Sequence, residues 1–112
     1  MMVTVQQIQT GFGNYFDAEL APQIVGLKKW AARAAVVTVA AKLPQMLEQY
    51  SGIAETAGFM KDGMVDIERV RDLFLEQARI TGPVREVFPV VGPITFTEHD
   101  IETLYRHITG GV

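Results

Sequence analysis

The residues best suited to acid-base chemistry stand together in the run Glu98-His99-Asp100, with Glu102 close behind. An imidazole between carboxylates can transfer protons or contribute to a metal site. On a helix, however, successive side chains diverge by about 100°, so these residues cannot converge on one ion. His107 lies roughly 12 Å beyond His99 along a helix axis, too far for a shared ligand shell. An acid-base or metal-dependent enzyme that uses His99 and Asp100 therefore remains only an alternative.

Other short motifs lack the residues that their chemistry requires. Asp62-Gly63-Met64 matches only the centre of a calcium-binding EF-hand loop, and Arg69 stands where a closing glutamate is needed. Gly11-Phe12-Gly13 lacks the third glycine and the lysine of phosphate-binding loops. The chain has no cysteine, and its one serine, Ser51, is not in a nucleophile elbow. We therefore expect no enzymatic activity, no cofactor, and no catalytic or metal-binding residues.

Composition and charge narrow the class of protein further. A chain of 112 residues with 48% hydrophobic and 21% charged residues predicts a single globular domain over residues 1–112. The net charge is -3 and the basic residues are scattered, so we expect no nucleic-acid binding. Arg33 and Lys42 interrupt the longest apolar run, which is too short to span a membrane. The first residues lack the features of a signal peptide, so we expect a cytoplasmic location.

Two helices are predicted in the amino-terminal half. The first covers residues 4–20, where apolar residues recur every four positions. Its seam comprises Ile8, Phe12, Phe16 and Leu20. Gly11 and Gly13 permit either a break or close packing in this helix. The second helix begins within residues 22–26 and runs to Pro44, which should kink or end it, with residues 45–50 continuing as helix.

Two further helices flank the only β-like segment that we predict. Lys61-Asp62-Gly63 indicates a tight turn, and Asp66 caps a helix that stops at Gly82-Pro83. The apolar stripe of that helix comprises Ile67, Val70, Leu73, Phe74, Ala78 and Ile80. Residues 84–97 predict a β-hairpin or extended arm turned at Gly92-Pro93. Thr97 and Asp100 then form a capping box for a last helix that ends near residues 110–111.

The predicted fold class is therefore mainly α. It consists of about four helices in one compact domain, with a short β-hairpin or extended arm over residues 84–97 before the last helix.

Residues 30–43, WAARAAVVTVAAKL, form the most unusual segment of the chain. The middle of this segment has almost no polar side chain on any side of a helix, so the helix must be covered. The cover is either the rest of this chain or a second subunit, and the sequence leaves both open. For the second case the candidate interface residues are Trp30, Val36, Val37 and Ala40. We therefore expect a self-associating interaction or assembly protein, either a homo-oligomer or a partner of another protein.

The aromatic and methionine residues allow a second function. They can form the core or line an apolar pocket, which would make the protein a small-ligand or regulatory binding module. These residues are Phe12, Tyr15, Phe16, Trp30, Phe74, Phe88, Phe96 and Tyr105, with Met46, Met60 and Met64.

Two segments in the second half of the chain carry a resemblance to a known group of proteins. Residues 62–74, DGMVDIERVRDLF, and residues 93–108, PITFTEHDIETLYRHI, are similar to small proteins encoded in bacterial prophage modules. The shared pattern is an acidic-glycine turn, a helix beginning with VDI, a short strand and a final helix. The resemblance implies a phage-related, non-enzymatic, assembly-associated role, and it transfers no catalytic or binding residue.

Overall fold

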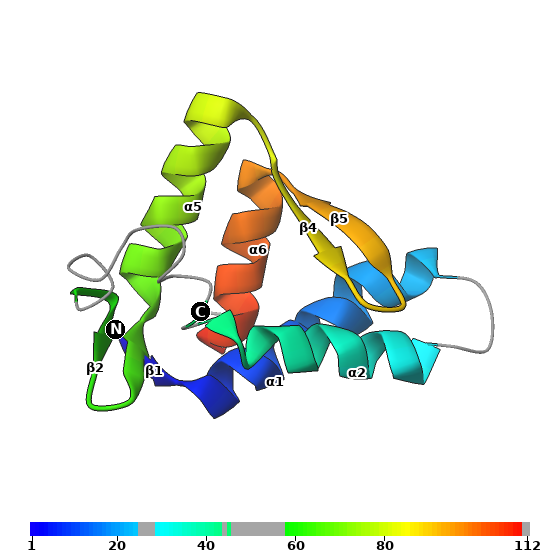
Figure 1. Cartoon of the computed structure of the whole chain (residues 1–112), viewed down its shortest axis with the longest axis horizontal. Coiled ribbons are helices and arrows are strands. Elements are labelled where there is room, and N and C mark those ends of the chain that lie inside the picture. Colours follow the sequence, from blue (N-terminus) through cyan, green and yellow to red (C-terminus); the bar gives the residue numbers. More distant parts are fainter. Residues whose placement is uncertain (25–28, 44, 46–57, 111–112) are drawn as a thin grey trace.

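The computed structural model describes residues 1–24, 29–43, 45 and 58–110 of the chain. Its α-helices are α1 (Val5–Tyr15), α2 (Lys29–Ala40), α5 (Ile67–Thr81) and α6 (Glu98–Ile108). A π-helical segment η1 (Phe16–Leu20) and a 3-10 segment η2 (Ala21–Gln23) follow α1. In Figure 1, α1 and α2 run along the base of the molecule while α5 and α6 rise from it. The predicted helical architecture is thus confirmed in its main parts.

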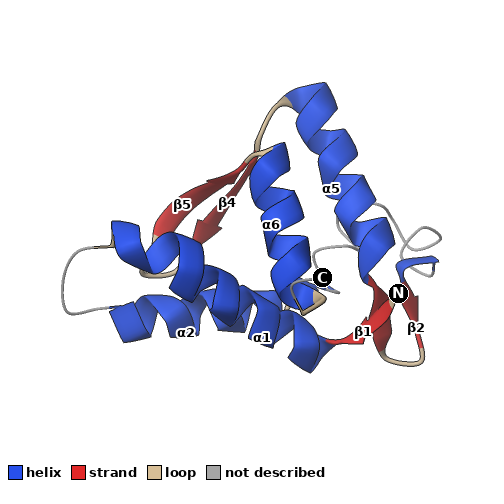
Figure 2. Ribbon diagram, turned by 180° about the vertical axis from the view of Figure 1, so that it is seen from behind, coloured by secondary structure: helices blue, strands red, loops and turns tan. Residues whose placement is uncertain are grey.

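Two small antiparallel sheets complete the fold (Figure 2). Strand β3 (Met64–Asp66) lies between β1 (Met2–Thr4) and β2 (Met60–Lys61), while β4 (Val84–Phe88) pairs with β5 (Gly92–Phe96). The predicted hairpin within residues 84–97 is confirmed. The expectation that it would be the only β-structure is wrong, because β1, β2 and β3 form a second sheet. These strands of two or three residues are too short to show an alternating pattern in the sequence.

The turn between β2 and β3 follows directly from its sequence. Lys61 pairs with Met64, which leaves Asp62 and Gly63 as a two-residue loop. Both loop residues have positive φ, 54° and 75°, as a type I′ hairpin turn requires. The predicted tight turn is therefore confirmed. Asp66 at the end of β3 caps α5, because its side chain accepts a hydrogen bond from the Arg69 backbone N–H.

The turn of the β4–β5 hairpin lies earlier than predicted. Phe88 pairs with Gly92, so residues 89–91 form the turn and Gly92 already belongs to β5. Pro93 lies within β5 opposite Val87. Proline is tolerated there because each strand of a two-stranded sheet has one side without a partner, where a missing N–H breaks no ladder hydrogen bond.

The boundaries of the first two helices also differ from the prediction. The first becomes π-helical at Phe16 rather than remaining α-helical to Leu20. The structure describes the second helix over Lys29–Ala40, so its α-helical part ends at Ala40 rather than at Pro44. Residues 22 and 23, at the predicted start, belong to the 3-10 segment η2, and residues 25–28 lie outside the described residues. Residues 46–50, where helix was predicted to continue, lie outside the described residues.

Gly11 permits close packing between the two helices at the centre of the fold. A Cβ atom added at Gly11 would lie 2.5 Å from the Cα of Ile108 in α6. Glycine is therefore required at this crossing, and α1 continues through it without the break that the sequence also allowed. At Gly13 an added Cβ atom would lie 2.6 Å from the guanidinium group of Arg33, which is the end of a flexible side chain and can move away.

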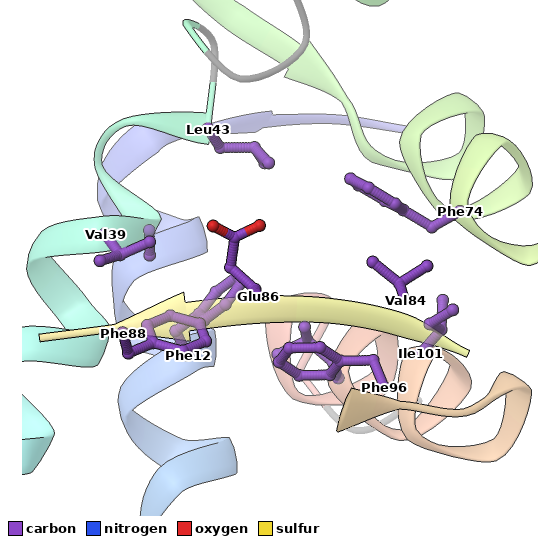
Figure 3. Close-up of a pocket in the computed structure, with 11 residues that line it drawn as sticks. Phe12, Val39, Leu43, Phe74, Val84, Glu86, Phe88, Phe96 and Ile101 are labelled. Atoms are coloured by element: carbon purple, nitrogen blue, oxygen red, sulfur yellow. The ribbon is translucent and has the colours of Figure 1, made fainter. Parts of the chain in front are cut away.

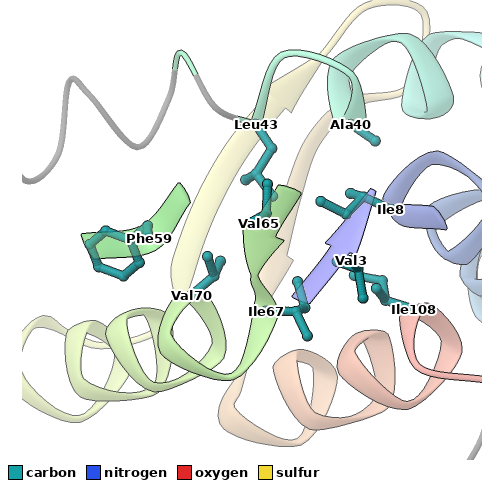
Figure 4. Close-up of a cluster of buried hydrophobic side chains, with 9 residues drawn as sticks. All are labelled: Val3, Ile8, Ala40, Leu43, Phe59, Val65, Ile67, Val70 and Ile108. Carbon is teal, nitrogen blue, oxygen red and sulfur yellow. The ribbon is translucent and has the colours of Figure 1, made fainter. Parts of the chain in front are cut away.

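The hydrophobic core consists of two clusters joined by shared side chains. The first surrounds the three-stranded sheet (Figure 4) and contains Val3, Ile8, Ala40, Leu43, Phe59, Val65, Ile67, Val70 and Ile108. The second lies beneath the hairpin and contains Tyr15, Phe16, Ala32, Val36, Leu75, Phe88, Ile94, Phe96 and Ile101. Phe12, Phe74 and Leu104 pack against both clusters. Ile80, predicted on the apolar stripe of α5, is 72% exposed in the last turn of that helix.

We expect Gly11→Ala to lower the free energy of unfolding by about 1–3 kcal/mol, because the new methyl group meets backbone atoms of Ile108. Gly13→Ala is the matched control. There the new methyl group meets the end of a flexible side chain, and the helix gains propensity, so stability should stay within about 1 kcal/mol of wild type. Urea unfolding followed by circular dichroism measures both variants, and equal stability of the two would contradict the proposed close packing.

Candidate functional site

Helix α2 buries one side and exposes the other. Ala32, Val36 and Ala40 are at most 2% exposed and belong to the core. Trp30 is 77% exposed and Val37 is half-buried. Val36 and Ala40 therefore leave the candidate interface, because side chains covered by their own chain are not available to another subunit. The chain itself therefore covers one side of α2 and leaves the opposite side exposed.

The exposed side of α2 has a distinctive composition. It comprises the exposed Trp30, Ala34 and Thr38 and the half-buried Val37, together with the half-buried Ala41 directly after the end of α2; we call these five residues the outer face of α2. These residues share one sector of the helix at about 100° per residue, and none of them is charged. The Thr38 hydroxyl donates a hydrogen bond to the backbone carbonyl of Ala34 at 2.7 Å. The polar group of this face is thus already satisfied within the helix.

A pocket of about 80 Å³ lies on another side of α2 (Figure 3). Helices α1, α2, α5 and α6 and the hairpin surround it. Its lining residues are Phe12, Val39, Ala40, Leu43, Phe74, Val84, Glu86, Phe88, Phe96, Ile101 and Leu104. All of them are apolar except Glu86. Four of the aromatic residues that the sequence suggested for an apolar pocket line this one: Phe12, Phe74, Phe88 and Phe96.

The other residues proposed for such a pocket lie elsewhere. Tyr15 and Phe16 are buried in the second core cluster. The Tyr105 ring lies against the Arg71 guanidinium, 4.5 Å from the ring centroid. Met60 and Met64 belong to the three-stranded sheet, whereas Met46 lies outside the described residues.

Glu86 occupies a position on β4 where an apolar residue is expected. Val84, Glu86 and Phe88 alternate along the inner side of the strand, whereas Arg85 and Val87 are exposed on the other side. Figure 3 shows the Glu86 carboxylate above β4, directed toward the space near Val39 and Leu43. The sequence did not single out this residue. Its signal was weak because the row Val-Arg-Glu-Val-Phe does not reveal which side of the strand faces inward.

The candidate acid-base residues do not form a common site. His99 is exposed, and the Asp100 carboxylate accepts hydrogen bonds from the Thr97 backbone N–H and hydroxyl, both at 2.9 Å. These contacts confirm the predicted capping box. The His107 ring packs edge-on against Tyr15 with 6.1 Å between centroids. Across residues 1–24, 29–43, 45 and 58–110, no three histidine or acidic side chains are placed to hold a metal ion.

Tyr15 is the titratable group whose environment differs most clearly from water. It is 3% exposed, and it lines a second, more polar cavity of about 390 Å³ together with Glu19 and Asp100. Burial, followed by the negative charges of Asp100 and Glu19, raises the pKa of Tyr15 to about 12. The folded state therefore favours the neutral phenol.

We expect the raised pKa of Tyr15 to make the protein less stable at alkaline pH. The unfolded chain ionises this phenol near pH 10, whereas the folded chain retains its proton to about pH 12. The stabilising contribution is therefore complete below pH 10 and is lost as the pH rises toward 12. Urea unfolding at pH 9 and 11 should show this loss for the wild type and less of it for Tyr15→Phe. Equal losses in both proteins would contradict the burial of Tyr15.

Comparisons with known proteins give no relative, so the interpretation of these sites rests on their geometry. Within the part of the chain that the structure describes, no helix is long and apolar enough to cross a membrane. No protein-family model, no curated protein and no solved structure matches this chain.

Proposed function

We propose that this chain is a non-enzymatic interaction protein that self-associates through the outer face of α2. The observation that carries the proposal is the exposure of Trp30. It has the highest exposed fraction, 77%, among the large hydrophobic side chains that the structure describes as exposed. Tryptophan is enriched among the residues that dominate binding energy at protein interfaces. Covering this ring removes a large apolar surface from water.

The rest of the outer face suits a dry contact between helices. Ala34 and Ala41 have small side chains that allow another helix to approach within about 8–10 Å between axes. Thr38 needs no new partner, because its hydroxyl already donates to the Ala34 carbonyl. No charge has to be removed from water at the centre of such a contact. The desolvation cost of pairing is therefore small.

A second copy of the same face is the partner that we favour. Most homo-oligomers are closed by a two-fold axis, which places the same surface on both sides of the interface. Trp30 and Ala41 lie eleven positions apart, roughly 16 Å along the helix. In an antiparallel pair centred between them, the Trp30 ring of each copy packs on Ala41 of the other. A large side chain thus meets a small one at both ends of the contact.

An assembly role also accords with the resemblance of residues 62–74 and 93–108 to prophage-encoded proteins. We extend the proposal to a phage-related assembly protein that acts in the cytoplasm. Genes for capsid or tail proteins beside its own gene would support this extension. A neighbourhood of metabolic genes would count against it.

We expect the wild-type protein to form a dimer, twice its chain mass of 12.4 kDa, at tens of micromolar. Trp30→Ala should weaken the dimer by roughly 30-fold or more, because both copies lose the ring that anchors the contact. Val37→Glu should dissociate it by placing a charge at the edge of the outer face. Size exclusion with light scattering measures the mass, and circular dichroism checks that helicity is retained.

The matched control for these variants is Ile80→Glu, which changes another exposed apolar side chain on α5, away from α2. It should leave the mass unchanged. A wild-type mass of 12.4 kDa at these concentrations would refute self-association. Dissociation by Ile80→Glu instead of Val37→Glu would place the interface on α5.

A further inference from the structure

We propose that the apolar pocket beside α2 binds a small molecule with an apolar body and a protonated amine, and that Glu86 is the counter-ion of that amine. The pocket lies among α1, α2, α5, α6 and the hairpin, and Val39 and Ala40 are the α2 residues within it. It is thus distinct from the outer face of α2. Ligand binding in this pocket does not require the protein to self-associate.

The position of Glu86 is the first argument. The neighbours of Glu86 on the inner side of β4 are Val84 and Phe88, and its cross-strand partner on β5 is the buried Ile94. Folding alone favours an apolar residue in such a row, because a carboxylate loses hydration there. A departure from the folding pattern is expected where a residue serves a site. Glu86 is such a departure.

The lack of a charge partner is the second argument. Among the residues that the structure describes, the Glu86 carboxylate forms no ion pair and accepts no hydrogen bond. The adjacent cation, Arg85, is exposed on the other side of the strand. A half-buried carboxylate without a partner attracts a cation more strongly than a fully hydrated one. The pocket therefore offers one negative charge in an apolar surrounding.

The rest of the lining specifies the body of the ligand. Phe12, Phe74, Phe88 and Phe96 supply aromatic surface, which accepts both alkyl groups and ammonium ions. The volume of about 80 Å³ is roughly half that of an engineered cavity of about 150 Å³ that holds benzene. A body of about three to five carbon atoms is therefore the size that fits. A short alkyl amine has both of the required features.

Three probes of equal length test the chemistry of the pocket: n-butylamine, 1-butanol and butyrate. Titration followed by amide resonances in two-dimensional NMR at pH 7 should give saturable shifts for n-butylamine at Val39, Glu86 and Phe88. Its affinity should exceed that of 1-butanol by about tenfold or more, and butyrate should bind most weakly because Glu86 repels it. Equal affinity for the three probes, or no saturable binding of the amine, would overturn the proposal.

Variants assign the preference to Glu86. Glu86→Gln keeps the size of the side chain and should lower n-butylamine affinity about tenfold while leaving 1-butanol affinity unchanged. The matched control Glu76→Gln removes an exposed charge on α5, outside the pocket, and should change neither affinity. Equal effects of the two variants would mean that the preference for the amine reflects only the net charge of the protein, which would overturn the assignment of Glu86 as the counter-ion. Val37→Glu, which tests self-association, should leave amine binding intact, so the two proposals can fail separately.

A stability measurement adds a readout that does not use a ligand. If Glu86 serves a ligand rather than the fold, Glu86→Leu completes the apolar row of β4 and should raise the urea midpoint of unfolding. A lower midpoint would show that the carboxylate stabilises the fold, which would overturn its assignment to a binding site.

Discussion

The close approach of α1 and α6 at Gly11 is the constraint on which the rest of the structure depends. Because a Cβ atom at Gly11 would overlap the backbone of Ile108, the distance between these helices is set by the absence of a side chain. Phe12, the next residue, then reaches both core clusters. Helix α1 also packs along α2 and so determines which side of α2 is buried. Both candidate sites depend on that orientation.

The composition of α2 has a different explanation from the one suggested by its sequence. An apolar residue on every side of a helix ordinarily indicates complete burial. In this structure the helix has three surroundings instead. Ala32 and Val36 pack in the core, Val39 and Ala40 line the pocket, and Trp30 stands on the outer face. The core and the pocket favour apolar side chains, whereas Trp30 is exposed to water, so the absence of a polar side does not require a central position in the fold.

Local signals in the sequence predicted much of this architecture, whereas signals that depend on distant partners did not. Asp62-Gly63 and the caps at Asp66 and Thr97 are determined by a few neighbouring residues, and they were predicted correctly. Strand β1 forms only because β3, some sixty positions later, offers its edge. Glu86 is a comparable case, because its neighbours in the pocket come from distant helices. The buried side of α2 could not be predicted either, because the middle of this helix has almost no polar side chains to mark the exposed side.

Trp30 and Glu86 depart from the folding pattern in opposite directions. Trp30 places a large apolar ring in water, and Glu86 places a charge among apolar side chains. A polar residue at position 30 and an apolar residue at position 86 would both suit their surroundings in the isolated chain. Such a chain would have fewer side chains in unfavourable surroundings. Neither departure is needed to form α2 or β4, since helix and strand tolerate the alternative residues. The self-association that we propose would account for the exposed ring of Trp30, and the amine binding that we propose would account for the charge of Glu86.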